Sequence, residues 1–162
     1  MRKIIVPSIV CILLLTAVSC ERSPKEEGKE EEELIIVSST VFSLDGTDCR
    51  WSTGNEWINE ELIIINSNEK LEKFIWCWND ALPPAIDFSK YTLLLAHGVA
   101  GNRVSMSLLD AVLFQTETGK YTLKVKIPLG LSGIGRWALG ILTPKLSDDA
   151  NITLEVRYIL FT

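Results

Sequence analysis

Histidine occurs only once in this chain of 162 residues, at His97, and no common catalytic motif is present. The Gly-x-Ser-x-Gly, His-Glu-x-x-His and phosphate-loop patterns are all missing, so no enzyme class is favoured and no cofactor is expected. His97 and two cysteines are too few ligands for a metal site and lie at no recognisable spacing. Acids outnumber bases by 21 to 16 without a basic cluster, which argues against nucleic acid as a partner.

A catalytic base at His97 is the one enzymatic alternative that the residues leave open. It would need a nearby hydroxyl such as that of Ser105 or Ser107. The competing interpretation, which we favour, is a partly buried residue at the end of a strand, so the chain is expected not to be an enzyme. The segment Gly130-Leu-Ser-Gly133-Ile-Gly135 follows Pro128 and leads into a strand, which is the wrong context for dinucleotide binding. We expect it to be a flexible loop between strands.

What the chain does have is a distinctive first twenty residues. Arg2 and Lys3 precede an apolar run from Ile4 to Val18, and small residues then lead to Cys20. This pattern resembles a bacterial lipoprotein signal, which implies that residues 1–19 are removed and that Cys20 receives acyl chains such as palmitate. A membrane-spanning helix is the alternative, but the run of about 15 residues is shorter than the roughly 20 that a span needs.

Residues 21–33 contain seven acids, three bases and no apolar side chain. Such a segment cannot bury enough surface to become ordered, so residues 20–33 are expected to form a lipidated, disordered tether. Residues 34–162 have the length of a single globular domain. The acidic tether would be repelled weakly by anionic lipid, so acyl chains on Cys20 must supply the membrane attachment.

Cys49 and Cys77 remain after Cys11 leaves with the signal and Cys20 is lipidated. An even pair in an oxidising compartment favours a disulfide. On the chain-entropy model, the bridge would stabilise the domain by about 3 to 4 kcal/mol. Two buried thiols are the alternative.

The remaining pattern predicts an α+β fold. A capping-box pattern at Asn66 to Glu69, followed by apolar residues at helical spacing, predicts one α-helix at about 67–78. Mostly antiparallel strands are expected at 34–42, 62–65, 91–96, 104–114, 121–127, 136–142 and 152–161. We therefore expect a sheet of six or seven strands, with the helix packed on it.

Tryptophan offers the main candidate for binding. On a helix, Trp76 and Trp78 would lie about 200° apart, so one of them should reach the surface. Trp51, Trp57 and Trp76 are the candidate ligand-binding residues, because exposed indole rings stack on sugars and anchor protein interfaces. The alternative is that these rings pack around the disulfide and in the core.

Residues 49–160 resemble a group of uncharacterised small lipoproteins from Bacteroidetes. The resemblance depends on Cys49-x-Trp51, on Ile63 to Cys77 and on Ile86 to Gly98, and it also implies the pairing of Cys49 with Cys77. A fainter likeness, from the 62–65 strand to Gly98, is to the C-terminal domain of a spirochaete protease-complex lipoprotein subunit. That family continues with a Thr-Gly-Gly-Tyr type of turn, whereas this chain has Gly98-Val-Ala-Gly101-Asn102-Arg103.

In those bacteria, a Lys followed by two acids behind the lipidated cysteine resembles a surface-export signal, and Lys25-Glu26-Glu27 fits this type. We therefore expect a lipid anchor in the outer membrane, with surface display favoured over the periplasmic face. The expected function is a non-catalytic envelope protein that binds a protein or serves envelope structure. A surface glycan-binding module that uses its tryptophans is the alternative, and a hydrolase that uses His97 is a weaker one.

Overall fold

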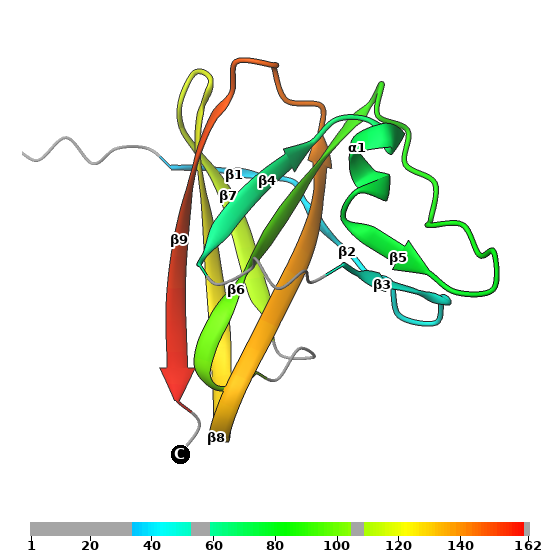
Figure 1. Cartoon of the computed structure of the whole chain (residues 1–162). Helices are drawn as coiled ribbons and strands as arrows, with labels where there is room; N and C mark the ends of the chain where they lie inside the picture. The colour runs from blue at the N-terminus through cyan, green and yellow to red at the C-terminus, as the bar shows by residue number, and fades with distance from the viewer. Residues whose placement is uncertain (1–33, 53–58, 105–108, 161–162) are drawn as a thin grey trace, which may run out of the picture. The chain divides into compact units, whose positions relative to one another are not determined.

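The computed structural model describes residues 34–52, 59–104 and 109–160, with the side chains of residues 103, 131 and 132 excepted (Figure 1). All described residues belong to one compact unit. The elements are β1 (Ile35–Val37), β2 (Thr40–Phe42), β3 (Cys49–Trp51), β4 (Glu61–Ile65), α1 (Asn68–Glu72), β5 (Ile75–Cys77), β6 (Tyr91–Val104), β7 (Asp110–Glu117), β8 (Lys120–Pro144) and β9 (Asn151–Leu160).

A seven-stranded sheet is organised around β8. The strand order in this sheet is β1-β7-β8-β6-β4, and β2 and β9 each pair with β8 as well. The first half of β8 has β7 antiparallel on one side and β9 parallel on the other. The second half pairs with β6 and, over three residues, with β2. One long strand therefore belongs to two groups of strands.

β8 bends between these two halves. Figure 1 shows its yellow first half and its orange second half meeting at the lower end of the molecule. The β6–β8 register shifts between Ala100 and Asn102 and again between Asn102 and Val104, opposite the glycine-rich segment of β8. Gly133 has φ +124°, a conformation that residues with a side chain rarely adopt. The predicted flexible loop at 130–135 is thus wrong, because these residues form the bend of a continuous strand.

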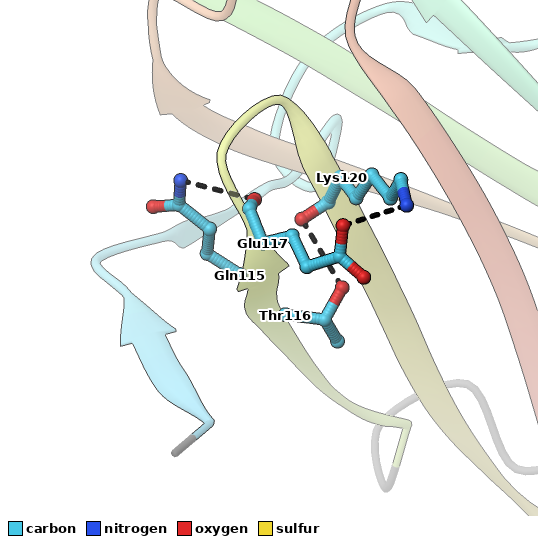
Figure 2. Close-up of polar contacts among 4 residues, drawn as sticks. All are labelled: Gln115, Thr116, Glu117 and Lys120. Carbon is cyan, nitrogen blue, oxygen red and sulfur yellow. Dashed lines mark hydrogen bonds and ion pairs between the residues drawn. The ribbon is translucent and has the colours of Figure 1, made fainter. Parts of the chain in front are cut away.

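A tight turn at Thr118 and Gly119 joins β7 to β8 in a hairpin. Gly119 has φ +75° there. Figure 2 shows the contacts that close it: the Lys120 ammonium lies 2.6 Å from a Glu117 carboxylate oxygen, and the Thr116 hydroxyl donates to the Lys120 carbonyl over 3.4 Å. The Gln115 amide also donates to the Glu117 carbonyl, over 3.3 Å. The turn therefore holds the first half of β8 in register with β7.

The first core lies between the two groups of strands. It is formed by alternate residues of β6 and of both halves of β8, with β4 and β9 packed at its border. Its buried members are Leu94, Ala96, Leu113, Leu123, Val125, Ile127, Trp137, Leu139, Ile141 and Leu146. Because the two groups face each other across this core, the sheet has the form of a sandwich joined through β8.

A second core covers the opposite face of β6 and of the second half of β8. Leu93, Leu95 and Ala138 on that face pack against Ile65, Leu71 and Ile75. The covering layer consists of the two-stranded β3–β5 sheet, α1 and the segment around Ile86. Since β6 has a core on each side, Leu93 to Ala96 are all fully buried. The prediction of a central strand at 91–96 is confirmed.

The α+β prediction is wrong, because the molecule is mostly β. The described residues contain nine strands, more than the six or seven expected, and the β8–β9 pair is parallel. The only helix among them is α1, whose N-cap is Ser67, with its hydroxyl accepting from the Lys70 amide over 3.2 Å. The predicted helix at 67–78 ends at Glu72. Residues 75–77 form β5 instead, because pairing with β3 outweighs the weak helical spacing.

Candidate functional site

A disulfide between Cys49 and Cys77 joins β3 to β5, as predicted. These two residues are direct partners in the antiparallel ladder. The ladder is extended at both ends, where the Trp78 amide donates to the Asp48 carbonyl over 2.9 Å and the Ser52 amide donates to the Phe74 carbonyl over 2.8 Å. The disulfide therefore secures a sheet that would be marginal alone.

The two faces of this small sheet differ in character. Cys49 and Ile75 are buried in the second core, whereas Arg50 and Trp76, which are partners in the ladder, point outward. Trp78 follows two residues after Trp76, which places it on the same side of an extended chain. The outer face thus presents three large side chains, which we call the aromatic cluster: Arg50, Trp76 and Trp78.

The aromatic cluster is exposed and ordered by its own contacts. The Trp76 and Trp78 rings have centroids 4.0 Å apart and lie at 78°, an edge-to-face pair. The Arg50 guanidinium carbon lies 5.0 Å from the Trp76 ring centroid and 4.6 Å from that of Trp78, within cation–π range of both. Even so, Trp76 is 44 % and Trp78 39 % exposed. Two tryptophans are thereby kept near solvent in a defined arrangement.

The structure separates Trp51 from Trp76, two of the three tryptophans that the sequence grouped. Trp76 belongs to the aromatic cluster, but Trp51 faces the opposite side of β3 and packs on Gly140, with Phe42 at a ring distance of 5.9 Å. Trp57 lies outside the described residues. Trp78, which sequence reasoning left out of the site, lies in the cluster. In the sequence, the alternation of Ile75 and Cys77 with Trp76 and Trp78 is the signal that predicts a strand here. The same segment also satisfies a helical spacing, which predicts a helix instead.

A pocket of about 450 Å³ lies beside Trp51, between β2, β3 and the second half of β8. Its apolar lining includes Val41, Phe42, Leu109 and Leu139. Asp45 and Arg50 are among its polar residues. Arg50 lies in both the pocket lining and the aromatic cluster, so the two features share β3.

His97 is 1 % exposed, on the same face of β6 as Leu95. Its Nε2 lies 3.7 Å from a carboxylate oxygen of Glu61, its ladder partner on β4. Burial lowers the pKa of His97 below its usual 6.5, and the nearby Glu61 carboxylate opposes that shift only in part. His97 is thus fully buried in the middle of β6, and not partly buried at the end of a strand as expected. Ser105 and Ser107 lie outside the described residues.

A second polar contact joins the two groups of strands, at the surface of the molecule. The Tyr158 hydroxyl, near the end of β9, donates to a carboxylate oxygen of Glu60 over 2.5 Å. Glu60 is the residue just before β4. Burial, followed by this hydrogen bond, raises the pKa of Tyr158 to about 12, while the Trp137 indole opposes the rise. β4 and β9 lie side by side here, so the contact closes one edge of the sandwich.

The described residues hold no group of three or more His, Cys, Asp or Glu side chains placed to bind a metal. No helix in the described part of the chain is long and apolar enough to cross a bilayer. Comparison with known proteins found no family model, no curated protein and no solved structure that matches this chain.

Proposed function

We propose that the protein is a non-catalytic lipoprotein of the bacterial outer membrane that binds another envelope protein through its aromatic cluster. The observation behind this proposal is that Trp76 and Trp78 stay exposed beside Arg50 on a sheet held by a disulfide. Tryptophan and arginine are the residues most enriched among the energetically dominant positions of protein interfaces.

Preorganisation adds to this argument. A flexible tryptophan loses rotamer freedom when a partner orders it, at a cost of about 0.5 to 1.5 kcal/mol for each side chain. Here the three side chains already contact one another, and the disulfide fixes the backbone under them. Less ordering therefore remains to be done when a partner binds.

A protein suits this surface better than a glycan chain does. Sugar-binding platforms use indole faces that are open and parallel to a groove, whereas these rings stand at 78° with the guanidinium close to both. An interface of mixed aromatic and cationic character is what a protein surface can complement. We therefore place the glycan-binding alternative second.

Attachment would come from acyl chains on Cys20, followed by the acidic tether at 21–33. Two or three chains give durable anchoring, whereas one gives only marginal binding. Lys25-Glu26-Glu27 favours display on the outer surface. The buried His97 supports the non-catalytic assignment, since a general base must reach its substrate.

The test uses the full, lipidated chain in its native envelope. Chemical cross-linking of intact cells followed by mass spectrometry should identify a protein joined to the wild-type chain, and Trp76→Ala with Trp78→Ala should reduce its recovery at least about ten-fold. Leu82→Ala is the matched control, because Leu82 is 85 % exposed and lies outside the cluster.

Equal recovery from the double variant and the control would refute the role of the cluster. Retention of the wild-type chain on a glycan array, lost in the double variant, would instead favour the second alternative. Separately, Cys20→Ser should release the protein from sedimented membranes, and continued sedimentation would refute the anchor.

A further inference from the structure

The bend of β8 and the end of β9 lie together at one end of the sandwich. The last residues of β9 pair with the last residues of the first half of β8, Ile159 with Pro128 and Leu160 with Leu129. Figure 1 shows the arrowhead of β9 beside the lower end of β8. We call this end of the molecule the tip, and define it by Ile134, Ile159 and Leu160.

The tip exposes large apolar side chains. Ile134 is 80 % exposed, Leu160 66 % and Ile159 39 %. Ile134 follows Gly133 at the bend itself, where the chain turns away from the core. Ile127 before the bend of β8 and Trp137 after it are both buried. The exposed apolar side chains therefore lie just beyond the end of the core.

Arginines stand directly behind these residues on both strands. Arg136 lies two residues after Ile134 and Arg157 two residues before Ile159, which places each on the same side of its strand as its isoleucine and about 7 Å farther from the tip. Both arginines are exposed, and neither makes an ion pair with the described part of the chain. Lys126 is the ladder partner of Arg157 and pairs with Asp110 at 3.4 Å.

We call Arg136 and Arg157 the cationic collar of the tip. A cluster of positive charge is unexpected in a domain whose net charge is negative. Residues 34–162 carry a formal net charge of −3, yet the charged groups around the tip are Arg136, Arg157, the Lys126–Asp110 pair and the Glu60 carboxylate that accepts from Tyr158, so bases outnumber acids there by three to two. Long basic side chains bury their stems among apolar atoms while their charged heads stay in water. An apolar end with a cationic collar is therefore complementary to the surface of an anionic bilayer, whose phosphates lie above its acyl chains.

We propose that the tip inserts into the headgroup region of a membrane rich in anionic phospholipid, with Ile134, Ile159 and Leu160 at the acyl boundary and Arg136 and Arg157 on the phosphates. The insertion requires neither the aromatic cluster nor acylation. The 13 residues of the tether can span up to about 45 Å, which leaves the domain within reach of the bilayer that anchors it. The tip would then set the orientation in which the domain rests on that surface.

The test measures co-sedimentation of residues 21–162 with lipid vesicles. This chain lacks the signal and Cys20, and both cores lie within its described part, so it retains the whole folded unit. It should bind vesicles that contain phosphatidylglycerol and bind those of phosphatidylcholine alone much more weakly. Arg136→Gln with Arg157→Gln should weaken binding to the anionic vesicles about 25-fold, since each basic side chain near such a surface contributes about a factor of five.

Ile134→Ser with Leu160→Ser should weaken binding at least about ten-fold, because two apolar side chains no longer leave water. The matched controls are Leu82→Ser for the apolar change and Lys70→Gln with Lys73→Gln for the charge change. Leu82, Lys70 and Lys73 are all exposed in wild type, and circular dichroism should show an unchanged fold.

Absence of binding to the anionic vesicles would overturn the proposal, as would equal losses in the controls. If the Ile134→Ser, Leu160→Ser variant instead converts a dimer in solution to a monomer without a change in vesicle binding, the tip is a contact between two copies and the proposal fails. None of these results would affect the aromatic cluster, whose residues are unchanged in every variant.

Discussion

Gly140 shows how much the covering layer depends on a single missing side chain. Its place on β8 lies under the Trp51 ring, and a Cβ added there would stand 2.7 Å from Trp51 Cζ2 and 3.1 Å from the Phe42 carbonyl oxygen. The ring packs on Phe42 and on the second core, so a Cβ at Gly140 would push it out of these contacts.

Gly140→Ala should therefore lower the free energy of unfolding by about 1 to 3 kcal/mol, the usual range for forcing extra volume into a packed site. Urea denaturation followed by tryptophan fluorescence measures the change. Gly101→Ala is the control, because a Cβ at Gly101 meets nothing within 4 Å, and its free energy of unfolding should stay within about 0.5 kcal/mol of wild type. Equal losses in both variants would show that the Trp51 contact is not the cause.

The disulfide could be predicted from the number of cysteines and the expected compartment, whereas the tryptophan site could not be predicted from composition. The expectation of an oxidising compartment, with two cysteines left over, was enough to predict the Cys49–Cys77 disulfide. The grouping of Trp51 with Trp76 failed, because neighbouring positions on a strand face opposite sides, and that alternation is invisible when the segment is taken for a helix.

At the scale of elements, the disulfide is what makes β3 and β5 a stable unit. Each strand has only three residues, and the pair forms no part of the seven-stranded sheet. Two short strands of this kind have few hydrogen bonds with which to offset the entropy of ordering.

Replacement of both Cys49 and Cys77 by Ala should lower the free energy of unfolding by about 3 to 4 kcal/mol, because the open form no longer contains a closed loop of this length. Denaturant titration of residues 21–162 measures the change, since this chain contains no other cysteine. Dithiothreitol should produce a similar loss in wild type and none in the double variant. A wild-type protein insensitive to the reductant would contradict a stabilising bridge.

Much of the sheet could be predicted from hydrophobic periodicity, which placed strands at 91–96, 121–127 and 152–161, within or close to the observed β6, β8 and β9. The helix at 67–78 could not be corrected from sequence, because Leu71, Phe74, Ile75 and Trp78 satisfy a helical spacing. Pairing with β3 decides the outcome, and this contact is distant in the chain. The continuity of β8 was hidden for a similar reason, since its glycines are typical of a loop.

At the scale of the whole molecule, His97 couples domain stability to pH. The native pKa of His97 lies below 6.5, so the unfolded chain takes up a proton on this residue at a higher pH than the native state does. The free energy of unfolding should therefore decrease as the pH falls below about 6.5, and the contribution is fully present above that value.

Urea titrations between about pH 8 and about pH 5.5 test this dependence, with a slope from His97 of at most about 1.4 kcal/mol per pH unit. His97→Asn should give a flatter profile, whatever its effect on stability at pH 8. Attribution to one residue is straightforward, because the chain contains no second histidine. A wild-type profile as flat as that of the variant would show that His97 takes up no proton on unfolding in this range.

The sharing of β8 between both groups of strands has a consequence for folding during synthesis. Neither group can complete its core before β8 is present, and the first group also needs β9, the last strand of the described chain. β1 must likewise wait for β7, more than seventy residues later. Pairings this remote are slow to form, so the growing polypeptide cannot acquire its native cores until β8 and β9 have been synthesised.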